Sequence, residues 1–314
     1  NLESVVAADG SINVSAGGDM VVTRVESTTS SAGNDVTLET SAGGVQLVSV
    51  SAGELGDVSV SSAGAITEDG DAATVVSGGE LSLGSVGGID VDTAVGTISA
   101  TATGAGAIVI EESDGVELKS VVAADGSISV SAGGDLVATS VESTTNSPEN
   151  DVTLETSEGD IQLVRVSAGE LGDVSVTSAG AITGDGDVAT VVSGGGLVLT
   201  AVGGIDVDTA VGTISATTTG AGAIVIEESD GVNLKNVVAA DGSISVSAGG
   251  AMVATSVEST TSSAGNDVTL ATSAGGVQLV KVSVGDLGDV SVSSAAQIEG
   301  DGTGAVEITG GGLS

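Results

Sequence analysis

The chain has 314 residues with 51 glycines, one proline and no cysteine, histidine or aromatic residue, and its 43 carboxylates against five basic residues give a net charge of −38. Binding to phosphates requires lysine and arginine, and stacking on bases requires aromatic rings, so this composition excludes a nucleic-acid partner. It also excludes a disulfide framework and a thiolate metal site. The chain has no run of 18 apolar residues, so insertion into a membrane is not expected.

The chain is built from tandem repeats. The stretch SVVAADGSINVSAGG at residues 4–18 recurs almost unchanged at Ser120 and Asn236, 116 residues apart each time. The repeats therefore cover residues 4–119, 120–235 and, incompletely, 236–314. We expect residues 1–314 to form one continuous domain, cut as a window from a longer array.

Each repeat contains a shorter period of alternating apolar residues. In the first copy, strands are expected to open in chain order at Ile12, Val36, Val58, Leu81 and Ile108, which are 24, 22, 23 and 27 residues apart. A second strand is expected eight or nine residues after each of these, as at Met20 and Val45, and a less regular third strand follows, as at Val48–Val50.

Three short strands separated by glycine-containing turns in about 23 residues predict one coil of a parallel β-helix, or β-solenoid. Stacked coils bury the apolar faces that one coil cannot bury alone. A solenoid of this length would be about 65 Å long. The repeat length also suits an immunoglobulin-like or cadherin-like sandwich, but the lack of aromatic core residues and of linker prolines favours the solenoid.

The region from Gly56 to Ile110, GDVSVSSAGAITEDGDAATVVSGGELSLGSVGGIDVDTAVGTISATATGAGAIVI, resembles the repeat regions of filamentous-haemagglutinin-like large exoproteins. The resemblance implies a right-handed parallel β-helix that forms the shaft of a secreted or surface-attached adhesin. We therefore expect an extracellular or cell-surface structural protein, whose partners are further copies along the rod axis or in filaments and a host or neighbouring cell surface.

An enzyme is not expected, and no catalytic, cofactor-binding or metal-ligating residue is assigned. A carbohydrate-active β-helix would need a groove with clustered carboxylates. Calcium binding is an alternative, because acidic turns of the oxygen-rich kind that Ca²⁺ prefers recur at Asp9-Gly10, at residues 68–71 and at residues 185–187. Asp-Gly is also common in tight turns, which is the favoured interpretation. A calcium-dependent array of sandwich domains is the main alternative function.

Two further features are candidates for surface roles. Aligning Ile89 with Val116 predicts exposed ladder pairs Asp92–Lys119 and Asp208–Lys235, with Asp90 beside Glu117. Two hydroxyl-rich loops are expected in each repeat, at residues 26–34 and 99–106 of the first copy. Such loops on a rigid scaffold are where binding often occurs, and their serines and threonines could carry glycan.

Overall fold

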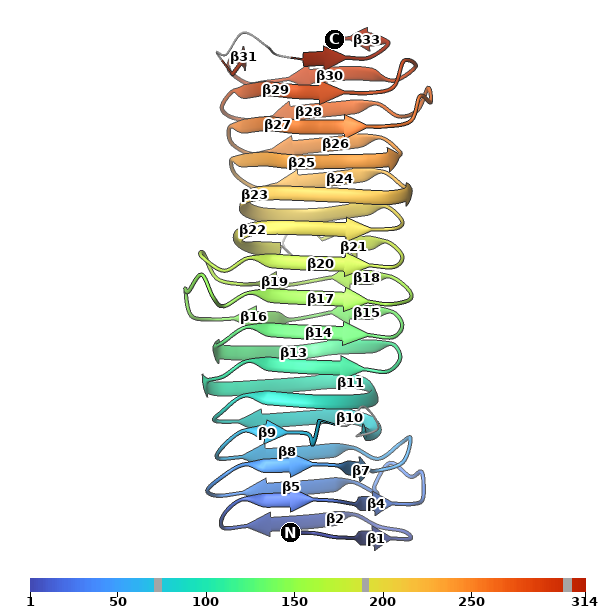
Figure 1. The fold of residues 1–314 in the computed structure, drawn as a ribbon, viewed down its shortest axis with the longest axis vertical. Helices are drawn as coiled ribbons and strands as arrows, with labels where there is room; N and C mark the ends of the chain where they lie inside the picture. The colour runs from blue at the N-terminus through green and yellow to red at the C-terminus, as the bar shows by residue number, and fades with distance from the viewer. Residues whose placement is uncertain (71–74, 188–191, 302–306) are drawn as a thin grey trace. The chain divides into compact units, whose positions relative to one another are not determined.

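The computed structural model describes residues 1–70, 75–187, 192–301 and 307–314. The chain divides into two compact units, Asn1–Ser157 and Glu158–Ser314, and each is described by itself. Within the described residues the structure contains strands and no α-helix, and the strands pair in parallel (Figure 1). No helix in these residues has the length and apolar character needed to cross a membrane.

The strands of the first unit are β1 Val5–Ala7, β2 Ile12–Ala16, β3 Met20–Val22, β4 Val25–Ser27, β5 Val36–Thr40, β6 Val45–Leu47, β7 Ser49–Ser51, β8 Val58–Ser62, β9 Ile66–Thr67, β10 Val75–Ser85, β11 Ile89–Ala105, β12 Ile108–Glu112, β13 Val116–Asp125, β14 Ile128–Ala132, β15 Leu136–Ala138, β16 Val141–Ser143 and β17 Val152–Thr156.

The strands of the second unit are β18 Ile161–Leu163, β19 Val166–Ser167, β20 Val174–Ser178, β21 Ile182–Gly184, β22 Val192–Ala201, β23 Ile205–Ala221, β24 Ile224–Glu228, β25 Val232–Asp241, β26 Ile244–Ala248, β27 Met252–Ser259, β28 Val268–Thr272, β29 Val277–Ser283, β30 Asp289–Ser293, β31 Ile298–Gly300, β32 Glu307–Thr309 and β33 Gly312–Leu313.

Alternation of side chains fixes which face of each strand is buried. In β5, Val36, Leu38 and Thr40 are buried, whereas the Glu39 side chain between them is exposed. The buried residues stack in register from turn to turn, as in the column Ile89, Ile108 and Ile128. Each unit is therefore a parallel β-solenoid, which confirms the predicted fold class and rules out the alternative of sandwich domains.

The number of residues per turn differs from the prediction. Leu81 pairs with Ile98, and Ile98 pairs with Leu118, so an additional turn lies where the sequence was interpreted as one long coil with a loop at residues 99–106. Those residues lie mainly in β11, with Ala100 and Ala102 buried. The solenoid has about 21 residues per turn rather than about 23.

One repeat contains a half-integral number of turns. Five successive pairings lead from Ile12 to Leu118, through Val36, Val58, Leu81 and Ile98. Ile128 lies ten residues beyond Leu118, which is half of the 20-residue turn that pairs Leu118 with Ala138. The 116-residue repeat therefore makes five and a half turns. As a result, Ile12 and its equivalent Ile128 lie on different faces of the first unit.

Candidate functional site

A hydroxyl-rich loop is anchored to the preceding turn in every copy. We use the name hydroxyl loop for residues 28–34, 144–150 and 260–266. In the first copy Asn34 is 4% exposed, and its amide donates hydrogen bonds to Asp9 Oδ1 (3.1 Å) and to the Thr29 carbonyl (2.9 Å). Its Oδ1 accepts a hydrogen bond from the Gly10 N–H (3.0 Å). The predicted loop at residues 26–34 is confirmed from residue 28 onward, since Glu26 and Ser27 belong to β4.

The same anchor is present in the other two copies. The Asn150 amide donates to Asp125 Oδ1 at 3.1 Å, and the Asn266 amide donates to Asp241 Oδ1 at 2.9 Å. Asp9, Asp125 and Asp241 are equivalent residues of the three copies, and Asp9 belongs to the Asp-Gly turn considered above as a calcium site. In the structure their carboxylates hold the hydroxyl loops in place.

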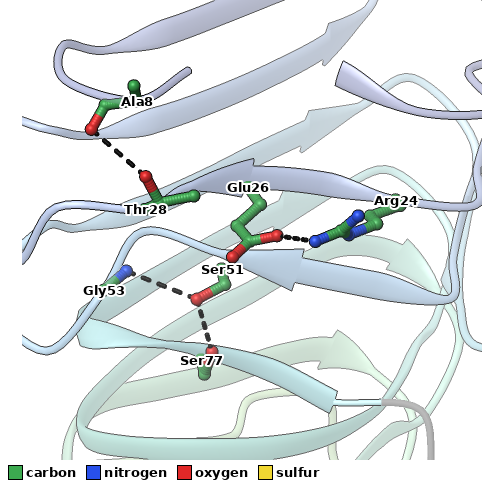
Figure 2. A network of polar contacts seen from close by, with 7 residues as sticks. All are labelled: Ala8, Arg24, Glu26, Thr28, Ser51, Gly53 and Ser77. Atoms are coloured by element: carbon green, nitrogen blue, oxygen red, sulfur yellow. Dashed lines mark hydrogen bonds and ion pairs between the residues drawn. The ribbon is translucent and has the colours of Figure 1, made fainter. Parts of the chain in front are cut away.

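The threonines of the loop also bond to the preceding turn. Figure 2 shows the Thr28 hydroxyl donating to the Ala8 carbonyl (3.2 Å). The Thr29 hydroxyl donates to the same oxygen. Ser31, by contrast, is exposed at the tip of the loop. The hydroxyls of Thr28 and Thr29 therefore have a structural role, and glycosylation of the loop stays a prediction.

A second loop, one turn further along, packs against the hydroxyl loop in the first and third copies. We use the name leucine loop for residues 53–57, 169–173 and 285–289. Gly53 adopts a φ of 70°, which favours glycine, and the Glu54 N–H donates to Ser30 Oγ (3.3 Å). In the third copy the Asp286 N–H donates to Ser262 Oγ (3.1 Å). In the first and third copies the leucine loop and hydroxyl loop form a loop pair on one edge of their unit.

The leucine in this loop is exposed in all three copies. Leu55 is 60% exposed, Leu171 is 57% exposed and Leu287 is 63% exposed. Beside the first loop pair lies a groove of about 390 Å³, which is lined by Ser30, Glu54 and other residues. Two serine hydroxyls on its wall form a ladder, with Ser77 Oγ donating to Ser51 Oγ at 3.0 Å (Figure 2).

Successive hydroxyl loops lie on opposite edges of the first unit. The first loop follows β3 and β4 and leads into β5 on the face that contains Ile12. The second loop follows β15 and β16 and leads into β17 on the face that contains Ile128. The two loops therefore connect the same two faces in opposite directions, as Figure 1 shows beside β4 and β16.

The predicted ladder pairs are wrong. Asp92 pairs in register with Glu111 and Asp208 with Glu227, while Asp90 lies opposite Val109 and not beside Glu117. Lys119 Nζ instead forms an ion pair with Glu80 Oε2 at 3.2 Å. The additional turn between Leu81 and Leu118 shifts the alignment of Ile89 from Val116 to Ile108, and this shift causes the error.

Two buried glutamates were not identified from the sequence. Glu112 and Glu228 are each 4% exposed. Glu112 Oε2 accepts hydrogen bonds from the Thr93 hydroxyl (2.8 Å) and the Val95 N–H (3.0 Å). Glu228 has equivalent contacts with the Thr209 hydroxyl (2.8 Å) and the Val211 N–H (3.1 Å). Burial raises the pKa of both carboxyls, and the hydrogen bonds oppose this shift only in part.

Carboxylates also gather on the surface of both units. Burial and the neighbouring Glu111 raise the pKa of Asp92, and burial and Glu227 raise the pKa of Asp208. Within the part of the chain that the structure describes, no group of three or more acidic side chains is arranged to hold a metal ion. Gly70 and Gly186 in the acidic turns adopt left-handed φ angles, as expected of tight turns. Asp71, the last residue of the predicted acidic turn at 68–71, lies outside the described residues.

A groove with clustered carboxylates lies in the second unit. It has a volume of about 460 Å³, and Asp208, Glu227 and Glu228 contribute to its wall. Ala271 lies in the same groove, at the position where the first two copies have Glu39 and Glu155. Because Glu228 is held by hydrogen bonds from its neighbours, Asp208 and Glu227 are the carboxylates available to a ligand.

No family model, curated protein or solved structure matches the chain. The resemblance to filamentous-haemagglutinin-like exoproteins therefore rests on the residues quoted above and stays a prediction.

Proposed function

We propose that the chain is an extracellular structural and adhesive repeat protein, in which the solenoid is a stiff shaft and the loop pairs are carried along it. The observation that supports the shaft is the stacking of buried aliphatic columns, such as Ile89, Ile108 and Ile128, with each turn hydrogen-bonded to the next. The proposed function is mechanical and involves no catalysis. No cofactor is required.

Charge and repetition support the same role. A net charge of −38 keeps neighbouring shafts apart and soluble. Near-identical copies increase length while repeating the same kinds of surface residue, which suits a spacer between a cell and a contact surface. Partners are then further copies along the axis and the surface to which the protein adheres.

Pulling on the two ends of the chain in an optical trap tests the shaft. We expect the chain to keep its folded extension under load and then to lengthen in discrete steps. Ile110→Ala, which removes a fully buried side chain, should lower the force of the first step. Val109→Ala, on the outer side of the same strand, is the control and should leave that force unchanged. A chain that lengthens smoothly from the lowest forces would contradict a mechanical role.

The groove beside Asp208 and Glu227 supports a second candidate, a carbohydrate-active β-helix. These carboxylates occupy neighbouring positions in one ladder, and the raised pKa of Asp208 suits a proton donor. Incubation with a panel of neutral oligosaccharides tests this function. Cleavage that is abolished by Asp208→Asn would support the enzyme and exclude a purely mechanical protein.

A further inference from the structure

The leucine loops carry an exposed apolar side chain between acidic residues. Leu55 lies between Glu54 and Asp57, and Leu287 lies between Asp286 and Asp289. The third copy differs from the first at two positions in this region, with Val284 for Ala52 and Asp286 for Glu54, but the leucine and the negative charges remain. Leucine is a residue that folded proteins usually bury. In this chain it is 57–63% exposed at the same place in all three copies.

The loop is held in place by contacts that leave the leucine outside. The Asp57 N–H donates to Asp35 Oδ1 (3.0 Å), and Asp57 Oδ1 accepts from the Glu80 N–H (3.1 Å). Gly53 packs against Ser30, since a Cβ on Gly53 would lie 3.2 Å from Ser30 Cα. A side chain that is displayed by a fixed loop loses little conformational freedom when it binds. This arrangement suits recognition.

The charges around the leucine restrict the partner. None of the five basic residues of the chain lies in a hydroxyl loop or a leucine loop. A second copy of this chain would bring further carboxylates to the same place and would be repelled. A partner with an apolar pocket and a cationic rim would bury the leucine and match the acidic flanks.

The leucine loops of the second unit lie on opposite edges. The loop with Leu171 follows β18, which pairs with β21, and β19, whose Val166 pairs with Val192. Val192 pairs with Thr209, in the segment of β23 that pairs with β24. The loop leads into β20, whose Val174 pairs with Leu197 of β22. The loop with Leu287 makes the reverse connection. It follows β29, whose Leu279 pairs with Ala254 of β27, and it leads into β30, which pairs with β28. One face contains β21, Ile205 of β23, β24, β26 and β28, which pair in this order. The other face contains Leu197 of β22, Ile214 of β23, Leu234 of β25 and β27, which also pair in this order.

We propose that the leucine loops are contact sites for a protein surface with an apolar pocket rimmed by basic residues, and that successive copies bind such partners on opposite sides of the solenoid. This inference rests on the proposed adhesive function and names its partner chemistry. The five-and-a-half-turn repeat makes the chain two-sided, so that one molecule bridges two partner surfaces.

Binding to a hexylammonium-coated sensor surface tests the chemistry of the contact, with an ethylammonium-coated surface as reference. The triple variant Leu55→Ser, Leu171→Ser and Leu287→Ser should bind the hexylammonium surface at least about tenfold more weakly, because no leucine side chain is then buried against the hexyl groups. Its binding to ethylammonium should not change. Val86→Ser with Val202→Ser is the matched control, since these valines are 54% and 51% exposed outside the loops.

Equal weakening by the valine control, or unchanged binding of the triple variant, would overturn the proposal. Cross-linking of hexylammonium-coated beads tests the two sides. Leu55→Ser retains Leu171 and Leu287 on opposite edges and should still cross-link the beads. Adding Leu171→Ser leaves Leu287 as the one leucine in the leucine loops, so the protein should coat the beads without cross-linking them. Failure of Leu55→Ser to cross-link while it binds would contradict the opposite placement. None of these results depends on the force measurement that tests the shaft.

Discussion

At the scale of single residues, Glu112 and Glu228 show how a solenoid accommodates an inward-facing carboxylate. Both side chains follow two buried isoleucines at alternating positions, and donors from the neighbouring turn satisfy them. The alternation Ile108, Ile110, Glu112 is the signal that could have identified the buried glutamate. The pattern is weak as a signal because charged residues are rarely buried.

These glutamates make stability depend on pH in a defined direction. Their pKa is raised in the folded state from the ordinary value of 4.5, so the folded chain takes up the two protons at higher pH than the unfolded chain does. Their contribution to the free energy of unfolding therefore increases as the pH falls from 7 toward 4.5 and is lost as the pH rises. We expect Glu112→Gln with Glu228→Gln to have a flatter pH profile in urea unfolding. Glu39→Gln with Glu155→Gln, at exposed positions, should keep the original profile, and equal profiles for both variants would contradict the assignment.

At the scale of elements, the sequence predicts a strand where aliphatic residues alternate and fails where the inner residues are small. Residues 99–106 alternate as strictly as the other strands, but their inner side chains are Ala100 and Ala102. Alanine, serine, threonine and glycine give little contrast in hydrophobicity, so the segment was interpreted as a loop. That one missed turn produced the incorrect pairings of Asp92 with Lys119 and of Asp208 with Lys235.

The hydroxyl loops are elements whose stability depends on one asparagine each. Replacing Asn34 by alanine leaves the Gly10 N–H and the Thr29 carbonyl without their partner. We expect Asn34→Ala to lower the free energy of unfolding by about 2–4 kcal/mol, because it removes three part-buried hydrogen bonds that contribute about 0.5–1.5 kcal/mol each. Asn13→Ala, at an exposed position in β2, should change it by less than about 0.5 kcal/mol. Urea unfolding measures both, and a similar small loss in the two variants would show that the anchor is dispensable.

At the scale of the whole molecule, the repeat in the sequence and the repeat in the structure are different lengths. The sequence repeats after 116 residues, and in the first unit these residues form five and a half turns. Two copies are therefore needed for a whole number of turns. Spacing alone could not reveal this, because identical sequences lead a reader to expect identical faces. The number of turns per repeat depends on the number of residues in each turn, and the turn from Leu81 to Ile98 takes only 17 residues.

The charge of the molecule predicts how salt affects its stability. With 43 carboxylates and five basic residues, repulsion outweighs exposed ion pairs such as Lys119–Glu80 and Lys281–Glu258. Raising sodium chloride from about 0.01 M to about 1 M shortens the screening length from about 30 Å to about 3 Å and should raise the melting temperature. A chain held together mainly by ion pairs would respond in the opposite way. Calcium chloride at matched ionic strength is the control for specific binding: a melting temperature above that in sodium chloride would restore the calcium-binding alternative, and an equal one would assign the effect to screening.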